Sequence, residues 1–261
     1  MRRRLTTAEP ETAALPVRNA PPSRLTAVRQ RTNSLIATIS GQMVLILLAV
    51  NVAMSAMTTP ARAEPRSGPI QIVAFGDSLT AGLGLAPGEA FPAVLQRQLK
   101  AAGHDVVIQN AGVSGDTTSG GLARLDWSIP DGTDLVILEL GANDMLTGQS
   151  ADRARANLDA IIVRLKARGI DILLAGMRAS RSLGSTYADA FDRIFPELAQ
   201  KHGVPFYPFF LEGVALDPAL NQPDGIHPTA EGVRRIATSI QPEVEPLIAK
   251  IQARRGRAQS K

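Results

Sequence analysis

Apolar positions along residues 68–251 follow two alternating patterns, short unbroken runs and longer stretches with a helical period. The unbroken runs end at glycine or polar residues, which is typical of buried strands. They predict strands at residues 70–75, 106–108, 135–140, 172–175 and 204–207. The periodic stretches predict helices at residues 91–102, 151–168, 187–202 and 232–252. Pro242 is expected to break or kink the last of these helices.

This alternation predicts the fold class. Short apolar strands separated by helices of ten or more residues favour a parallel sheet that is covered by helices on both faces. Residues 68–251 show no internal repeat and no sign of a second core. We therefore expect a single α/β domain with three layers, α/β/α, around a five-stranded parallel sheet.

The loops that follow the strands are the first places to look for a site, because open α/β sheets bind ligands at the carboxyl ends of their strands. Three such loops, and one near the C-terminus, are polar and contain glycine. They are residues 76–80 (GDSLT), 110–117 (NAGVSGDT), 141–144 (GAND) and 224–228 (DGIHP). We expect the first three loops to converge on one edge of the sheet.

A candidate nucleophile stands in the first loop. Ser78 follows a strand and is preceded by Gly76 and Asp77, a place where a hydroxyl can be exposed at the sheet edge. Acyl transfer needs such a nucleophile together with a base, a group that orients the base, and donors for the oxyanion. The alternative is that Ser78 caps the N-terminus of a helix, a common role for serine in this position. Ser114 is the second candidate nucleophile.

The base can be chosen by elimination among three histidines. His104 lies in a helix-to-strand turn and His202 lies at the end of a helix before Gly203, so both are expected at the opposite edge of the sheet. His227 remains, with Asp224 three residues before it, a spacing that lets the carboxylate reach the imidazole in a tight turn. The alternative is a surface turn that contains a histidine by chance.

Donors for an oxyanion are available in the second and third loops. Gly115 offers a backbone N–H with no Cβ in the way, and Asn143 offers a side-chain N–H. With the N–H of Ser78 they would supply three donors. Glycine and asparagine are also ordinary turn residues, so each has a purely structural alternative.

The composition excludes several kinds of chemistry. The 261 residues contain no cysteine, which excludes disulfides, a thiolate nucleophile and thiolate-ligated metals. The three histidines are far apart, so we expect no histidine-based metal site. Residues 64–249 hold 15 Lys and Arg against 22 Asp and Glu, a net charge of −7, although the whole chain carries +4. A nucleic-acid partner is not expected, because it would require a basic face on the folded domain.

The N-terminal 63 residues have the features of a secretory signal. An arginine-rich stretch precedes an uncharged apolar segment at residues 35–57, and the A-x-A pattern at 61–63 follows. We expect cleavage after Ala63 and export to the periplasm or the medium, with residues 64–251 as the domain and 252–261 as a basic tail. The alternative is an uncleaved anchor in the inner membrane, since about 20 apolar residues can span a bilayer. Only that alternative implies membrane contact.

Taken in order, the four loops resemble the conserved blocks of the SGNH (GDSL) hydrolase family. Residues 75–79 resemble block I, residues 112–116 block II, residues 141–144 block III and residues 224–228 block V. Further segments, including residues 121–125 (GLARL) and 187–191 (YADAF), are similar to the bacterial periplasmic thioesterase I/lysophospholipase/arylesterase subgroup.

This resemblance implies a flavodoxin-like fold and a serine esterase. It implies Ser78 as nucleophile, His227 as base and Asp224 as its orienter, with an oxyanion hole made by Ser78, Gly115 and Asn143. The implied substrate is a small acyl ester or thioester, the enzyme needs no cofactor and no metal, and it acts as a monomer. A carbohydrate acetylesterase of the same fold is the alternative. Met145, Leu146 and residues 209–211 are candidates for an acyl groove, although a place in the core accounts for most of them equally well.

Overall fold

The structure is a computed structural model that describes residues 68–259. These residues belong to one compact unit, Pro65–Lys261. The predicted signal segment and its cleavage position after Ala63 lie outside the described residues. Within the described residues, no helix is long and apolar enough to cross a membrane.

Five parallel strands form one sheet in the spatial order β2-β1-β3-β4-β5. The strands are β1 (Ile70–Gly76), β2 (Val106–Gly112), β3 (Leu135–Glu139), β4 (Asp171–Ala175) and β5 (Phe206–Tyr207). Every residue of the central strand β3 is buried, as expected for a parallel strand covered on both faces. After β2 the chain returns past β1 to form β3 on its other side, so the carboxyl ends of β1 and β3 lie where doubly wound sheets generally bind ligands.

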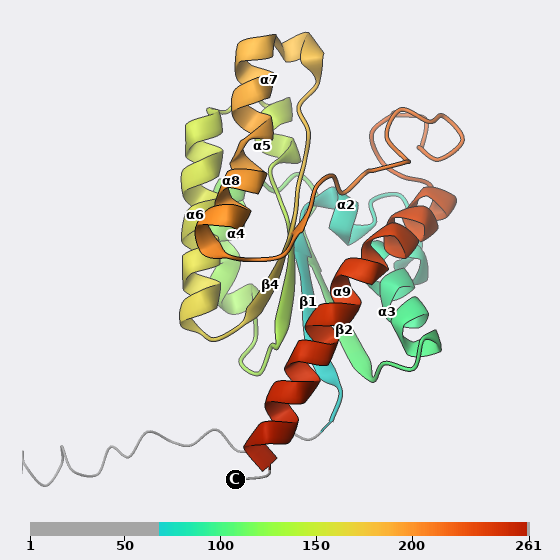
Figure 1. The fold of residues 1–261 in the computed structure, drawn as a ribbon. Helices are drawn as coiled ribbons and strands as arrows, with labels where there is room; N and C mark the ends of the chain where they lie inside the picture. The colour runs from blue at the N-terminus through green and yellow to red at the C-terminus, as the bar shows by residue number, and fades with distance from the viewer. Residues whose placement is uncertain (1–67, 260–261) are drawn as a thin grey trace, which may run out of the picture. The chain divides into compact units, whose positions relative to one another are not determined.

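Helices cover both faces of this sheet (Figure 1). One face carries α3 (Phe91–Ala101) and α9 (Ala230–Gln259), which pack against each other. The other face carries α4 (Thr118–Ser128), α6 (Ala151–Ala167) and α8 (Ile194–His202). The short helices are α2 (Ser78–Ala81), α5 (Ala142–Leu146) and α7 (Ser185–Asp192). The expected three-layer α/β/α domain with a five-stranded parallel sheet is confirmed.

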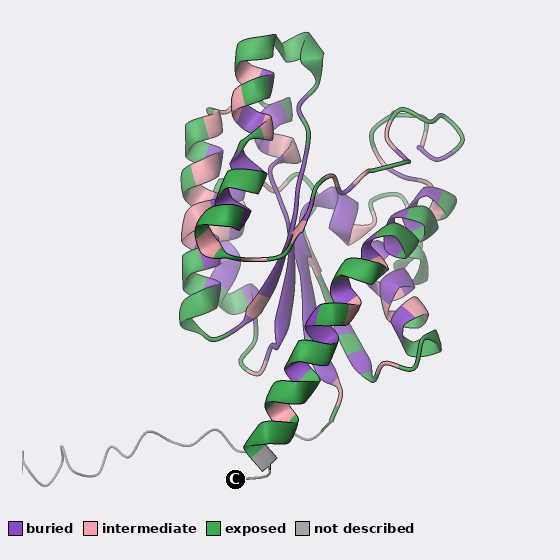
Figure 2. Cartoon of the chain, in the orientation of Figure 1, coloured by how far each residue is buried: buried purple, intermediate pink, exposed green. Residues whose placement is uncertain are grey.

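The core lies between the sheet and the two helix layers. Figure 2 shows buried residues along the strands and the inner sides of the helices, with exposed residues facing outward. Although aromatic residues make up only 4% of the chain, five phenylalanines are among its largest fully buried side chains. They are Phe75, Phe91, Phe191, Phe195 and Phe210. A cysteine-free chain therefore rests on an extensive apolar core.

Proline explains two differences from the sequence-based boundaries. The helix expected at 187–202 is two helices, α7 and α8, separated at Arg193. Pro196 has no N–H to donate to the carbonyl of Asp192, so the hydrogen-bond ladder is interrupted there. The strand expected at 204–207 contains only Phe206 and Tyr207, because Pro205 cannot donate to a ladder and contributes only its carbonyl, to the N–H of Leu174.

The prediction that Pro242 breaks the last helix was wrong. Helix α9 continues through Pro242 and Pro246 to Gln259, beyond the expected end at residue 252. Apolar residues on both sides of the prolines are fully buried, and this packing offsets the lost hydrogen bonds. They include Ile240, Val244, Ile248 and Ile251.

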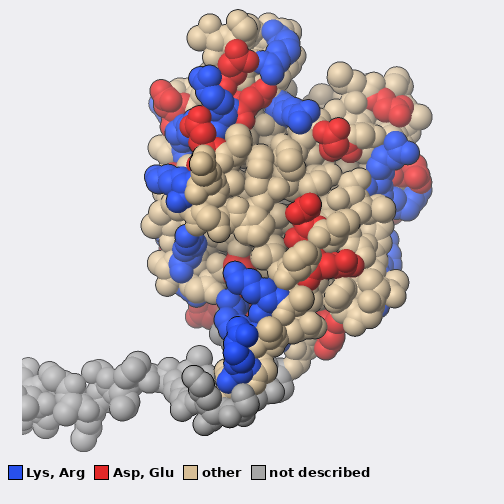
Figure 3. Space-filling view, viewed as in Figure 1, with Lys and Arg blue, Asp and Glu red and all other residues tan. Residues whose placement is uncertain are grey.

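Ion pairs hold the end of α9 against the start of the sheet. Figure 3 shows basic side chains gathered at this end of the molecule. Arg255 binds Asp134 at 2.6 Å, while Lys250 and Arg254 both bind Asp171 at 2.8 Å. Part of the basic tail is therefore a helical element that pairs with acidic residues at the amino ends of β3 and β4.

Candidate active site

The turn between β1 and α2 presents Ser78. Asp77 caps helix α2 through a 2.9 Å hydrogen bond from the N–H of Leu79 to its side chain, and Ser78 is the first helical residue. The capping alternative for Ser78 is therefore wrong, and its hydroxyl is left for another partner. The turn is tight: a Cβ on Gly76 would lie 2.5 Å from the carbonyl oxygen of Glu139. Glycine is the residue that fits between β1 and β3 here.

His227 provides that partner from a loop 149 positions away. Its Nε2 lies 2.8 Å from the Oγ of Ser78, and its Nδ1 lies 2.7 Å from Oδ2 of Asp224. With the Nδ1–H donated to Asp224, Nε2 is free to accept the Ser78 O–H. The side chain of His227 is 13% exposed and that of Asp224 is 45% exposed, so this pair is accessible from the surface.

The loop that carries His227 is stabilised by hydrogen bonds from its own backbone N–H groups to the side chain of Asp224. Oδ1 of Asp224 accepts the N–H groups of Ile226 and His227, each at 3.0 Å, in a turn that Gly225 closes with φ +75°. These backbone hydrogen bonds, His227 first, lower the pKa of Asp224 to about 2. Asp224 is thus a carboxylate throughout the neutral range and stabilises an imidazolium beside it.

Gln222 connects this loop to the segment that follows Ser78 and helix α2. Its side-chain amide donates 2.8 Å to the carbonyl of Leu83, which follows α2, and 2.9 Å to the carbonyl of Pro228. Its backbone N–H donates to the carbonyl of His227 at 2.7 Å. One side chain therefore holds the loop that carries His227 against the segment that follows Ser78.

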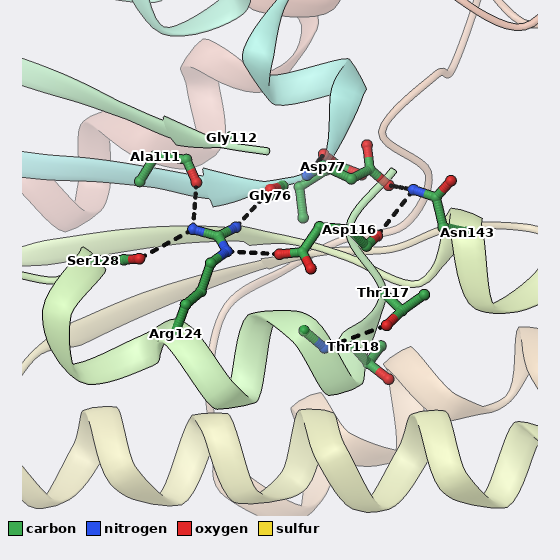
Figure 4. Close-up of polar contacts among 12 residues, drawn as sticks. Gly76, Asp77, Ala111, Gly112, Asp116, Thr117, Thr118, Arg124, Ser128 and Asn143 are labelled. Carbon is green, nitrogen blue, oxygen red and sulfur yellow. Dashed lines mark hydrogen bonds and ion pairs between the residues drawn. The ribbon is translucent and has the colours of Figure 1, made fainter. Parts of the chain in front are cut away.

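The two remaining candidates, Gly115 and Asn143, lie next to the same edge of the sheet. Gly115 adopts φ +81°, a left-handed conformation that favours glycine. Asn143 is in α5, and its amide nitrogen donates to Oδ2 of Asp77 at 3.1 Å and to the carbonyl of Asp116 at 2.9 Å (Figure 4). Asn143 therefore bridges the neighbour of Ser78 and the neighbour of Gly115.

Two buried carboxyl groups, those of Asp77 and Glu139, lie beside the turn that carries Ser78, and the sequence predicted a role for neither of them. Burial raises the pKa of Asp77 to about 6. The pKa of Glu139 is raised well above its usual range, first by burial and then by the charge of Asp77. Oε2 of Glu139 accepts the hydroxyl of Thr80 at 2.8 Å. The available signal was a glutamate at the end of an otherwise apolar strand, LVILE.

The other candidates of the sequence lie elsewhere. Ser114 is exposed on its loop. His104 lies 3.6 Å from Glu245, and His202 lies 2.5 Å from Asp159, so each of these histidines has a structural carboxylate partner away from Ser78. Among residues 68–259 no group of three or more His, Asp or Glu side chains is arranged to hold a metal ion.

Comparison with known proteins identifies a family to which this chain is similar. Residues 74–235 match the model of the GDSL-like lipase/acylhydrolase family. The chain is 36% identical over 178 residues to esterase TesA of Pseudomonas aeruginosa, covering 68% of this chain and 89% of that protein. It is 35% identical over 178 residues to thioesterase 1/protease 1/lysophospholipase L1 of Escherichia coli K12, covering 68% and 84%. The solved structure of AlinE4, an SGNH-hydrolase family esterase, matches with 47% identity and a TM-score of 0.59, covering 69% of this chain and 97% of that one.

Proposed function

This chain belongs to the GDSL-like lipase/acylhydrolase family and is an ester-bond hydrolase, and on that premise we propose that Ser78, His227 and Asp224 are its catalytic triad. One observation carries the proposal. The two ring nitrogens of His227 make two hydrogen bonds, one of 2.8 Å to the Ser78 hydroxyl and one of 2.7 Å to the Asp224 carboxylate, so the three side chains form a continuous hydrogen-bonded series. A nucleophile, a base and a group that orients the base require this geometry.

In the first half of the reaction Nε2 of His227 takes the Ser78 proton as Oγ bonds to the carbonyl carbon of the ester. The carbonyl π electrons move to the oxygen, and Asp224 stabilises the imidazolium that forms. When the intermediate collapses, the bond to the leaving oxygen or sulfur breaks and His227 donates its proton there. The acyl group remains on Ser78.

In the second half a water molecule replaces the leaving group. His227 accepts its proton, the hydroxide adds to the acyl carbon, and collapse returns the proton to Oγ of Ser78. The carboxylic acid is released and the triad is restored. Every proton in this sequence passes through Nε2 of His227, so the neutral imidazole is the form that starts each half.

We assign the oxyanion to the N–H groups of Ser78 and Gly115 and to the side-chain amide of Asn143. Both N–H bonds of that amide are engaged, with Asp77 and with the carbonyl of Asp116. One of them must be shared with the oxyanion when it forms. A developing charge is a stronger acceptor than a neutral carbonyl, so the sharing favours the transition state over the ground state.

The proposed substrate is a small ester or thioester with an apolar acyl chain. Exposed apolar side chains lie within five residues, along the chain, of a proposed site residue: Leu83 after Ser78, Val113 before Gly115, Leu146 after Asn143 and Ile226 before His227. Phe210, by contrast, is fully buried and packs edge-on to Phe91 at 5.0 Å, so it belongs to the core. Because one chain supplies the triad and all three donors, we propose a monomer.

Replacement of Ser78 tests the assignment. Ser78→Ala should fold with unchanged thermal stability and lose about 10³-fold or more in kcat on a nitrophenyl ester. It should also lose labelling by a fluorophosphonate probe. Ser114→Ala, the matched serine in the neighbouring loop, should keep both. Full turnover by the Ser78→Ala protein would overturn the proposal.

A chain-length series tests the substrate class. With nitrophenyl esters and acyl thioesters of increasing length, kcat/KM should rise from acetyl to medium chains, because added methylenes contact the apolar side chains around the site. A flat response, with deacetylation of sugar esters instead, would assign the enzyme to the carbohydrate esterases.

We further propose that the enzyme is exported and that its leader is removed after Ala63. The support is the basic stretch, the apolar segment and the A-x-A pattern at residues 61–63. Sequencing of the protein recovered from its native compartment should begin at Glu64. A membrane fraction that retains residues 35–57 would show an anchor instead.

A further inference from the structure

A single buried arginine connects the loops that carry the proposed oxyanion donors. Arg124 lies in the second turn of α4 and is 6% exposed. Its Nη2 donates to the carbonyl of Gly76 at 2.8 Å, and its Nη1 donates to the carbonyl of Ala111 at 2.9 Å. Its Nε donates to Oδ2 of Asp116 at 2.6 Å, as Figure 4 shows. The guanidinium therefore reaches the ends of β1 and β2 and the following loop.

The placement of this cation is specific. The side chain of Asp116 is 9% exposed, so the pair is withdrawn from water at a cost that only good geometry offsets. Nη1 also donates to Oγ of Ser128 at 3.2 Å, and the guanidinium carbon lies 4.1 Å from the centre of the Phe75 ring. A planar fork can reach several acceptors in fixed directions, whereas a lysine ammonium acts as one point charge.

Two acceptors of Arg124, Gly76 and Asp116, lie within two residues of a proposed donor. Gly76 is two residues before Ser78, and Asp116 directly follows Gly115. The backbone carbonyl of Asp116 accepts the amide of Asn143 at 2.9 Å. The guanidinium thus touches no substrate position itself, but it fixes the backbone from which Ser78 and Gly115 donate and the acceptor that orients Asn143.

We propose that Arg124 is the positioning residue of the oxyanion hole, through its simultaneous contacts with Gly76, Ala111 and Asp116. The inference rests on the proposed function, because it requires Ser78, Gly115 and Asn143 to act as donors. The competing account is that Arg124 only holds α4 against the sheet. The two accounts differ in what they predict for catalysis by a folded variant.

The first test compares Arg124→Lys with Arg164→Lys. Arg164 forms a surface ion pair with Asp126 and lies on the neighbouring helix α6. With a nitrophenyl ester, Arg124→Lys should lower kcat about 10- to 100-fold, the effect of misplaced donors, and leave KM within about twofold. Arg164→Lys should change neither. A folded Arg124→Lys protein with parental kcat would overturn the inference.

The second test separates positioning from support of the fold. If Arg124 acts through the hole, its replacement should matter much less once Asn143 is gone. In the Asn143→Ala background we expect the loss caused by Arg124→Lys to shrink to about threefold or less, because coupled residues are not additive. The same loss in both backgrounds would overturn the inference and leave the proposed triad intact. Parental activity of Asn143→Ala alone would overturn the proposed hole as well.

Asp116→Asn covers the case in which Arg124→Lys does not fold. This variant keeps the size of the side chain and the backbone carbonyl that Asn143 uses, but removes the charge from the partner of Nε. We expect a fall in kcat of about 3- to 10-fold, again reduced in the Asn143→Ala background. Near-ultraviolet circular dichroism reports the fold of each variant. An equal loss in both backgrounds contradicts the inference here too.

Discussion

At the scale of single residues, the environment lowers the pKa of one carboxyl group at the candidate site and raises the pKa of another. Backbone hydrogen bonds keep Asp224 ionised at the surface, whereas burial favours the neutral form of Glu139, which contacts the residues on either side of Ser78. A neutral carboxyl at Glu139 can donate one hydrogen bond and places no negative charge next to Asp77 and Thr80, which flank Ser78. The same residue type would serve poorly there as a carboxylate.

Replacement of Glu139 by glutamine should therefore change how stability depends on pH. The pKa of Glu139 is raised on folding, so the folded protein keeps a proton that the unfolded chain releases above its usual value of 4.5. Stability falls as the pH rises through that window, and Glu139→Gln removes this fall. The melting temperature of Glu139→Gln relative to the parent should rise between pH 4.5 and pH 8.

The exposed Glu197 provides the control for this experiment. Its side chain is 50% exposed in surface pairs with Arg155 and Arg193, so Glu197→Gln should show no comparable trend with pH. A constant difference between Glu139→Gln and the parent at every pH would mean that Glu139 is ionised in the folded protein.

At this scale the sequence predicted the members of the proposed triad, but it predicted neither Arg124 nor Glu139. Ser78, Asp224 and His227 were predictable because each stands in a short polar loop whose chemistry is local. Arg124 was not, because two of its acceptors are the backbone carbonyls of Gly76 and Ala111, which every residue type has. Glu139 carried a visible signal, but its partner Thr80 is 59 positions away.

At the scale of elements, packing decides where local rules fail. Helix α4 was not expected, because its sequence TSGGLARLDWS has two glycines and only a weak apolar face. Thr117 starts it by accepting the N–H of Gly120, and burial of Leu125 against the sheet stabilises it. Conversely, the three central strands β1, β3 and β4 begin and end within one residue of their expected bounds, because their apolar runs are unbroken. The edge strand β2 was expected to end at residue 108 but continues to Gly112 through polar residues.

The end of α9 offers a test at this scale. Arg255 donates to Asp134 at 2.6 Å and to the carbonyl of Gly68 at 2.8 Å, and Asp134 is buried. Arg255→Ala would leave the Asp134 carboxylate with the N–H of Gln71 as its remaining partner. Urea unfolding should show a loss of about 2–4 kcal/mol in the free energy of unfolding.

Arg234→Ala is the matched control, in the same helix. Arg234 pairs with Glu231, and both side chains are more than half exposed, so the loss should stay within about 1 kcal/mol. Equal effects of the two replacements would mean that the Arg255–Asp134 pair contributes no more to stability than a surface ion pair.

At the scale of the whole molecule, the strand order brings the chemistry together. With the order β2-β1-β3-β4-β5, the carboxyl ends of β1, β2 and β3 are neighbours, so the three loops that follow them meet. This convergence was predictable from the alternation of strands and helices. The position of the fourth loop was not, because residues 208–229 contain no helix or strand pattern that fixes their course.

The same scale gives a prediction about the exported form. The five-stranded sheet and all the proposed site residues lie within residues 68–259, and β1 begins at Ile70. A chain that begins at Glu64 should therefore have the melting temperature and the kcat/KM of the full chain. A marked loss of either quantity would show that residues 1–63 contribute to the folded enzyme.

The distance of 149 positions between Ser78 and His227 has a consequence for biosynthesis. The ribosome adds the proposed nucleophile Ser78 early, whereas the proposed base His227 is among the last fifth of the residues to be added. If the proposed triad is correct, a growing polypeptide lacks its base until synthesis is nearly complete. Prematurely terminated chains that end before His227 should therefore not hydrolyse esters.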